Sequence, residues 1–252
     1  MSDHWYYCPN LRIGENTLPA DEAHHALRVM RVRGGDSLTL FDGAGNVGVG
    51  VARADSGGDA IRANKKASSL VVEIREVLRN SAPSPKLTII TAACKGPRMT
   101  TLVEKCTELG VSRIVIAGFA RSVVKVSSNG VEKLQRTALE ACKQSRRPWL
   151  PEIRAAANGV DGLTKIAEDP LVAGFIANPT PGASALSQAV RNAGNVTAIA
   201  VAIGPEGGFT DDEVEAMQKY GAQAVTLTPY ILRVETAAVC AASVVMCRDE
   251  SA

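Results

Sequence analysis

The stretch VAIGPEGGFTDDE, from Val201 to Glu213, joins an apolar run to a loop with three glycines and then to the start of a helix. Thr210 followed by Glu213 has the pattern of a capping box, which predicts that the helix begins near Asp211. A strand, a glycine-rich loop and a helix in this order are typical of α/β proteins, in which ligands bind beyond the carboxyl ends of the strands.

The chain around this stretch repeats the same alternation from Leu87 onward. Apolar runs cover residues 87–94, 113–118, 171–177, 196–204 and 223–229, and helical patterns cover residues 101–110, 131–145, 212–221 and 234–246. Short apolar strands between helices predict a parallel sheet that is covered on both faces. The fold class is therefore α/β.

The N-terminal part has a different pattern. A short helical pattern ends at Gly34 and Gly35, and strand patterns follow at residues 37–43, 46–54, 59–66 and 70–78, separated by Gly, Asp and Ser turns. Residues 79–86, RNSAPSPK, have the composition of a linker. We therefore expect a small β-rich domain at residues 1–80 and an α/β domain at residues 81–252.

Residues 43–48, GAGNVG, match the GxGxxG pattern of dinucleotide-binding sites. That fingerprint should open a helix, whereas an alternating VGVGVA follows here. The match is interpreted as a hairpin turn.

Composition limits the function classes. With 46% hydrophobic and 21% charged residues the chain is globular, and no apolar run approaches the roughly 20 residues of a membrane span. The N-terminal MSDHWYYCPN lacks the order of a signal peptide, so we expect a cytoplasmic protein that binds no membrane. The six cysteines include no close CxxC pair and the three histidines lie near the N-terminus, so neither disulfides nor a metal site are expected.

Charge is distributed unevenly along the chain. Residues 81–154 carry 13 Lys and Arg against 5 Asp and Glu, whereas residues 155–252 carry 5 against 11. Much of the positive excess lies between Arg121 and Arg154. Two interpretations stay open: a solvated helix end whose cations complement the dipole, and a face that binds phosphate.

The glycine-rich loop is a poor match to a phosphate-binding loop. It lacks the lysine and hydroxyl of GxxxxGK[ST], and Glu206, Asp211 and Asp212 would repel a polyphosphate. The loop therefore suits a ligand without phosphate. The alternative is a tight turn in which Glu206 is fixed by backbone amides or by an arginine.

Five ordered motifs carry a family resemblance that spans nearly the whole chain. They are Lys95-Gly96, KxxELG (Lys105, Glu108, Leu109, Gly110), EAxxQSxR (Glu140, Ala141, Gln144, Ser145, Arg147), GPEGG and ILRxETA, the last with Val234 at the variable position. Together they make the chain similar to the ribosomal-RNA uridine-N3 methyltransferases of the SPOUT superfamily. Thr228, Tyr230 and Val234 depart from the family pattern, where glycine, arginine and threonine are expected.

The resemblance implies a PUA-like or OB-like barrel at residues 1–80 and a trefoil-knot methyltransferase domain at 81–252, a rare exception to unknotted folds. It implies S-adenosylmethionine as cofactor and 16S rRNA of the small ribosomal subunit as substrate. The residues that would hold the cofactor are Ala177, Ile203, Gly204, Pro205, Gly207, Gly208, Leu227, Thr228, Tyr230, Ile231 and Leu232.

The implied chemistry is methylation of uracil N3 without a metal. Arg233 would stabilise negative charge on the uracil oxygens, and Glu235 would orient Arg233 or accept the proton, or else it is a first-turn acid favoured by the helix dipole. Candidate RNA contacts are Lys95, Arg98, Gln144, Arg146 and Arg147.

The family also implies a homodimer. The helical pattern at 234–246 is apolar almost all round, so part of its surface is expected to pack on its own sheet and the rest on a partner chain.

Three alternatives remain open at the level of sequence. One is a methyltransferase that acts on tRNA or 23S rRNA. The second is a non-catalytic RNA-binding protein, which would not need both the GPEGG and the ILRxETA loops. The third is a nucleotide-dependent α/β enzyme, which would bind NAD or ATP in preference to S-adenosylmethionine.

Overall fold

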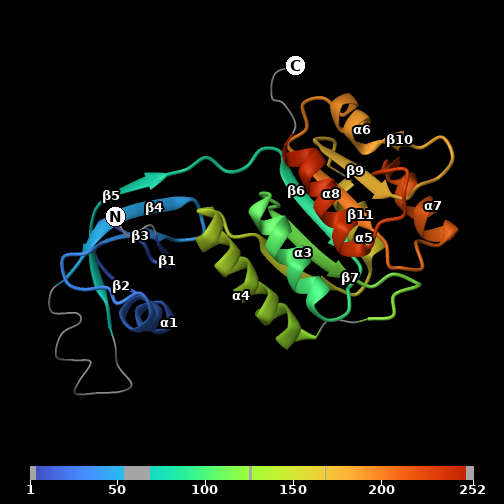
Figure 1. Cartoon of the computed structure of the whole chain (residues 1–252). Coiled ribbons are helices and arrows are strands. Elements are labelled where there is room, and N and C mark those ends of the chain that lie inside the picture. The colour runs from blue at the N-terminus through green and yellow to red at the C-terminus, as the bar shows by residue number, and fades with distance from the viewer. Residues whose placement is uncertain (1–3, 54–68, 125–126, 168, 248–252) are drawn as a thin grey trace. The chain divides into compact units, whose positions relative to one another are not determined.

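The computed structural model describes residues 4–53, 69–124, 127–167 and 169–247, and the chain folds into two compact units (Figure 1). The first unit comprises residues 1–82 and 142–150, and the second comprises residues 83–141 and 151–252. The chain first passes from one unit to the other between residues 82 and 83, close to the expected boundary at residue 80. Residues 142–150 differ from that expectation, because they return to the first unit.

The first unit contains a five-stranded mixed sheet in the order β1-β3-β4-β5-β2. Its elements are β1 (Trp5–Tyr7), β2 (Gly14–Thr17), α1 (Ala20–His24), which continues as a π-helical turn (His25–Val29), β3 (Ser37–Phe41), β4 (Asn46–Ala52) and β5 (Val71–Arg79). Strand β1 pairs with β3 in parallel, and the other pairs are antiparallel. The core lies between this sheet and the helical segment. The strand expected at residues 59–66 falls outside the described residues.

The GxGxxG match is a hairpin, as predicted. Strands β3 and β4 pair antiparallel from Ser37 opposite Val51 to Phe41 opposite Val47, and residues 42–45 turn between them. Asp42 accepts hydrogen bonds from the backbone amides of Ala44 and Asn46, which closes the turn.

The second unit contains a seven-stranded sheet in the order β10-β12-β9-β11-β6-β7-β8, in which every neighbouring pair is parallel. The strands are β6 (Lys86–Thr91), β7 (Arg113–Ala117), β8 (Glu152–Ala156), β9 (Val172–Ala177), β10 (Ser184–Ala185), β11 (Ala198–Ile203) and β12 (Gln223–Thr226). The five apolar runs predicted as strands correspond to β6, β7, β9, β11 and β12. The predicted parallel sheet is confirmed.

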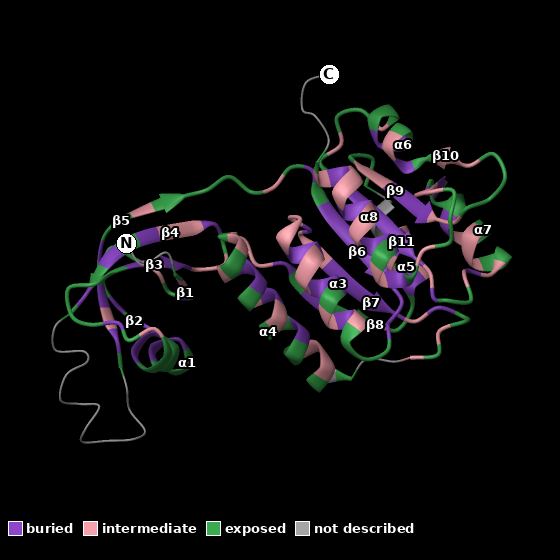
Figure 2. Cartoon of the chain, in the orientation of Figure 1, coloured by how far each residue is buried: buried purple, intermediate pink, exposed green. Residues whose placement is uncertain are grey.

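Helices cover both faces of this sheet. They are α3 (Pro97–Glu108), α4 (Ser128–Ser145), α5 (Gly159–Ala167), α6 (Leu186–Asn192), α7 (Asp211–Lys219) and α8 (Val234–Met246). Side chains of α3, α4, α6 and α8 share one apolar core with the sheet, and side chains of α5 and α7 share the other. Figure 2 shows the central strands as buried between these layers.

The last strand and the last helix contact different strands of the sheet. Strand β12 pairs with β9, whereas α8 packs over β6 and β11 and lies beside α3 (Figure 1). The chain therefore returns across β9 after β12. The trefoil knot implied by the resemblance would be tied at this return, and it stays a prediction.

Candidate active site

A pocket of about 300 Å³ opens at the carboxyl ends of β9, β11 and β12. Its lining comes mainly from the residues that follow β9, from the GPEGG loop after β11, and from residues 227, 228 and 230–232 of the segment that joins β12 to α8. The sequence predicts a ligand at this edge of the sheet.

The structure brings all eleven predicted cofactor-binding residues into this one pocket. They are Ala177, Ile203, Gly204, Pro205, Gly207, Gly208, Leu227, Thr228, Tyr230, Ile231 and Leu232. Sequence reasoning missed the other lining residues, which are Asn178, Pro179, Glu206, Phe209, Val225, Val234 and Ala237. Asn178 and Pro179 directly follow a predicted strand, so the rule that located the GPEGG loop also applies to them.

Glu206 is the only charged residue among the eighteen that line the pocket, all of which belong to the described part of the chain. Without a lysine or arginine in the lining, a polyphosphate would find no counter-charge there. The Glu206 carboxylate lies 3.4 Å from a guanidinium nitrogen of Arg98 on α3. Backbone amides and an arginine were the two partners expected for Glu206, and the arginine is the one observed.

The glycines of the GPEGG loop serve different local needs. Gly208 has φ +70°, a left-handed conformation that other residues adopt only with strain. A Cβ at Gly207 would lie 3.2 Å from the Cβ of Arg121. Since Gly207 also lines the pocket, we expect Gly207→Val both to press on Arg121 and to fill space that the ligand needs.

The helix after the loop begins as predicted. Thr210 is the N-cap of α7, its hydroxyl accepts a hydrogen bond from the Glu213 amide, and the Glu213 carboxylate accepts one from the Thr210 amide. This reciprocal capping box places the negative charge of Glu213 in the first turn, where the helix dipole stabilises it.

Hydroxyl groups shape the second loop of the pocket. The Thr226 hydroxyl donates to the Thr228 carbonyl at 3.0 Å, and the Thr228 hydroxyl donates to the Tyr230 carbonyl at 2.9 Å. Thr228, which stands where the family pattern has glycine, therefore stabilises the turn. In the same loop, Tyr230 and Ile231 are 78% and 96% exposed.

The two predicted catalytic residues lie at the start of α8 and point to different surroundings. Arg233 is the exposed N-cap, and Glu235 sits in the first turn with its side chain mostly buried. No hydrogen bond or ion pair joins them in the described structure, so the expectation that Glu235 orients Arg233 is not met.

Glu235 faces Arg98 and Cys94 instead. Its Oε2 atom is buried without a hydrogen-bond partner among the described residues, and it lies 4.0 Å from a guanidinium nitrogen of Arg98. Burial and then the charge of Glu235 raise the pKa of the Cys94 thiol to about 11. Burial also raises the pKa of Cys106 to about 12 and that of Cys142 to about 11. All three side chains are buried in the core, and the raised pKa values keep their thiols protonated at neutral pH.

The predicted RNA contacts divide between the two units. Lys95 and Arg98 flank the N-terminus of α3 in the second unit, with Lys95 exposed and Arg98 engaged with the two glutamates. Gln144, Arg146 and Arg147 belong to the first unit. Gln144 and Arg146 are exposed, whereas burial lowers the pKa of Arg147.

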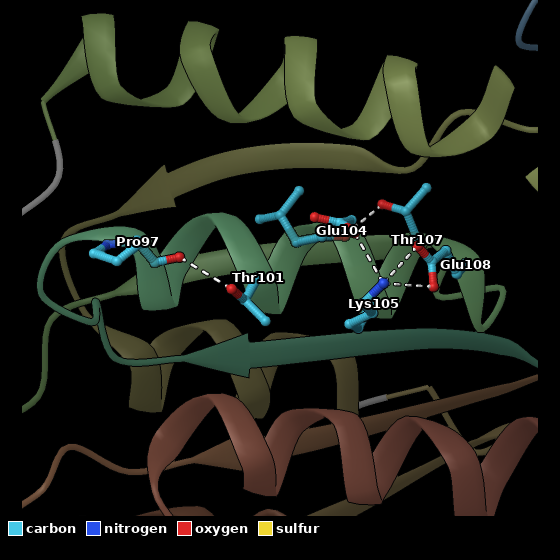
Figure 3. Close-up of polar contacts among 7 residues, drawn as sticks. Pro97, Thr101, Glu104, Lys105, Thr107 and Glu108 are labelled. Carbon is cyan, nitrogen blue, oxygen red and sulfur yellow. Dashed lines mark hydrogen bonds and ion pairs between the residues drawn. The ribbon is translucent and has the colours of Figure 1, made fainter. Parts of the chain in front are cut away.

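The KxxELG motif builds the end of α3 and not the pocket. Lys105 Nζ donates hydrogen bonds to the carboxylates of Glu104 and Glu108, each at 2.9 Å (Figure 3). These bonds, led by the one to Glu104, raise the pKa of Lys105. The helix ends at Glu108, and Gly110, two residues later, has a φ of +92°, which suits glycine.

Among the described residues there is no group of three side chains that would ligate a metal, and no helix long and apolar enough to cross a membrane.

The sequence matches two family patterns. One, described as an RNA methyltransferase domain, covers residues 81–246, and the other, described as an RNA methyltransferase PUA domain, covers residues 18–51. The chain is 31% identical to the ribosomal RNA small subunit methyltransferase E of Synechocystis sp., with 88% of this chain and 69% of the relative covered. It is 28% identical to the protein of the same name from Bacillus subtilis, with 93% and 90% covered.

Two solved structures with bound S-adenosylmethionine have a similar fold. A methyltransferase from Legionella pneumophila superposes with a TM-score of 0.78 at 28% identity, covering 96% of each chain. The ribosomal RNA small subunit methyltransferase E of Neisseria gonorrhoeae gives a TM-score of 0.78 at 27% identity, covering 95% of each chain.

Proposed function

Since the chain belongs to the family of RNA methyltransferases that carry a PUA domain, we propose that it methylates RNA of the small ribosomal subunit with S-adenosylmethionine as cofactor. The observation that carries this proposal is the single pocket formed by the GPEGG loop and the loop that joins β12 to α8. Each loop is one continuous segment of the chain. The first is the GPEGG motif, and the second runs into the ILRxETA motif.

The lining of the pocket fits this cofactor. It combines apolar side chains such as Ile203, Leu227 and Leu232 with the backbone of a glycine-rich loop, and it offers no cation for a phosphate. S-adenosylmethionine has an apolar adenosine, a positive sulfonium and no phosphate. A volume of about 300 Å³ lies at the small end of the range for ligand pockets, so the ligand would be held closely.

We further propose that the target is N3 of a uridine in 16S rRNA. When bound, S-adenosylmethionine supplies the methyl group: an N3–C bond replaces the S–C bond, and S-adenosylhomocysteine and the N3 proton are released. Because N3 lies on the pairing edge of uracil, the base must be unpaired or flipped out. No metal is required, since the methyl group is already activated.

The residues of this chain then have three tasks. Arg233, exposed beside the pocket lining, would stabilise the negative charge that develops on the uracil oxygens. Glu235, one of whose carboxylate oxygens has no hydrogen-bond partner within the described part of the chain, is the candidate that accepts the N3 proton, directly or through water. Lys95, Gln144 and Arg146 have exposed side chains and would contact RNA.

Primer extension tests this function. A methyl group at N3 blocks base pairing, so reverse transcriptase should stop at one uridine of 16S rRNA from wild-type cells. The stop should disappear in a strain without the gene and return with a plasmid copy. An unchanged 16S pattern, with a lost methyl group in 23S rRNA or tRNA, would overturn the proposed substrate. Because the substrate is ribosomal RNA, we also propose a cytoplasmic location.

A further inference from the structure

The segment Phe119–Ser122, which follows β7, contacts the GPEGG loop from outside the pocket. The Nη1 atom of Arg121 donates hydrogen bonds to the carbonyl oxygens of Gly207 at 2.9 Å and Phe209 at 3.1 Å. These two carbonyls lie on either side of Gly208, the residue with the left-handed backbone. One guanidinium therefore bonds to the backbone on both sides of Gly208.

The same segment also contacts the helix that follows the loop. The amide of Ala120 donates to Glu213 Oε1 at 2.7 Å, while Glu213 Oε2 accepts the Thr210 amide at 2.9 Å. The rings of Phe119 and Phe209 pack edge to face, with centroids 5.2 Å apart. Three independent contacts therefore join one short segment to the loop and to its helix cap.

Arg121 itself does not line the pocket. Its aliphatic part packs on Gly207, since a Cβ at that glycine would lie 3.2 Å from the Cβ and 3.4 Å from the Cδ of Arg121. A loop with three glycines has a large conformational entropy to lose when a ligand orders it. A contact that orders the loop beforehand reduces this cost and so strengthens binding.

We propose that Arg121 is a positioning residue that holds the GPEGG loop in the conformation that binds S-adenosylmethionine, without contacting the cofactor. This inference rests on the proposed function of the pocket. Arg98 holds the same loop less firmly, through an ion pair of 3.4 Å between partly exposed side chains of Arg98 and Glu206.

Calorimetric titration of the full chain with S-adenosylmethionine tests the inference through two variants. Arg121→Met keeps the aliphatic packing on Gly207 and removes both hydrogen bonds, so the Kd should rise about tenfold or more. Arg121→Lys keeps one charged donor without the planar fork, so its Kd should lie between those of the wild type and Arg121→Met. Because Arg121 is exposed, both variants should keep the wild-type Tm within about 2 °C.

Arg113→Met is the matched control. Arg113 lies at the start of β7, at the opposite end of that strand from Phe119, and makes an exposed ion pair of 2.6 Å with Glu152. Its loss should leave the Kd for S-adenosylmethionine unchanged. Hydrogen exchange gives a second readout in the absence of cofactor: the amides of residues 207–209 should exchange faster in Arg121→Met than in the wild type.

The outcomes separate the two proposals. Wild-type protein that binds S-adenosylmethionine, together with an Arg121→Met variant of equal affinity and equal loop exchange, would overturn the role of Arg121 alone. An equal loss of affinity in Arg113→Met would also overturn it, because the effect would then be non-specific. Wild-type protein that binds no S-adenosylmethionine would overturn the proposed function and this inference with it.

Discussion

At the scale of single residues, Glu235 is the side chain near the pocket whose role is most open to test. Its Oε2 atom is buried and accepts no hydrogen bond among the described residues, and Arg98 at 4.0 Å is the cation that faces it. A buried carboxylate oxygen without a donor carries a free-energy cost, which a role in accepting a proton would explain.

Glu235→Gln keeps the shape of the side chain and removes its ability to accept a proton. We expect the single-turnover methylation rate to fall by about 100-fold or more, while the Kd for S-adenosylmethionine stays within about twofold. Glu104→Gln is the control, since Glu104 lies on the same side of the sheet but pairs with Lys105 on the surface of α3 (Figure 3). Normal turnover in Glu235→Gln would leave Glu235 with a structural role only.

The sequence predicted pocket-lining residues that lie in continuous segments, and it gave no signal for contacts between distant segments. The eleven pocket residues were found because most follow strands in two continuous motifs. Arg121 was missed, because it reaches a loop 86 residues further along the chain and bonds to backbone carbonyls, which every residue possesses. Nothing in the residue types at Gly207 or Phe209 encodes that contact.

At the scale of elements, α3 and α4 end in the same way with different residues. After α3, the Val111 amide bonds to the Cys106 carbonyl, and Gly110 between them has φ +92°. After α4, the Arg147 amide bonds to the Cys142 carbonyl, and Arg146 has φ +56°. Both are Schellman-type ends, and glycine is the residue that this position favours. An arginine there is strained, which points to a function for its side chain.

Two substitutions of Arg146 separate strain from function. Arg146→Gly and Arg146→Ala both remove the side chain, so both should weaken RNA binding equally and lower the slope of log K against log salt by about 0.7–1. Only Arg146→Gly relieves the backbone strain, by about 1 kcal/mol, so its Tm should be about 2–4 °C above that of Arg146→Ala. Filter binding at several salt concentrations and calorimetry measure the two effects. RNA binding equal to that of the wild type would restore the interpretation of a solvated helix end.

Several elements of the second unit that sequence reasoning did not single out have weak local signals. Strand β8 reads EIRAA and has only one buried residue, because it is an edge strand and its alternation is weak. Helix α5 contains Gly162 in its interior, and α6 has only seven residues. Tertiary packing against the sheet, and not local propensity, stabilises these elements.

At the scale of the whole molecule, a single domain boundary at residue 80 does not account for residues 142–150, which belong to the first unit. Within the first unit, the Trp149 indole donates to the Ser81 carbonyl at 3.0 Å, and Lys143 pairs with Glu22 at 2.9 Å, with both side chains largely buried. Helix α4 is continuous through this transition, so no change of composition marks it in the sequence. Residues 142–150, which include Arg146, thereby belong to the unit that contains the match to a PUA domain.

The homodimer stays a prediction, and the two faces of α8 determine how it should be tested. Val234, Ala237, Ala238, Ala241, Ala242 and Val245 are buried in their own chain, so the sheet covers one face of the helix. Ala242→Glu is not a suitable probe of the interface, because Ala242 is fully buried in its own chain. A charge at that position would unfold the unit and would not report on dimerisation.

The other face of α8 is the appropriate place for the test. Val239, Cys240 and Ser243 are partly exposed and Thr236 is exposed, and no charged residue follows Glu235 in the helix. A solvated helix face normally carries charge, so we expect a second copy to cover this face in a two-fold interface. Ser243→Glu should therefore give a folded monomer with an unchanged circular dichroism spectrum, and because Arg233 and Glu235 begin the same helix, methylation should be lost with the dimer. A wild-type protein that is monomeric by light scattering and fully active, or a monomeric Ser243→Glu variant that stays active, would contradict the expectation that methylation needs the dimer.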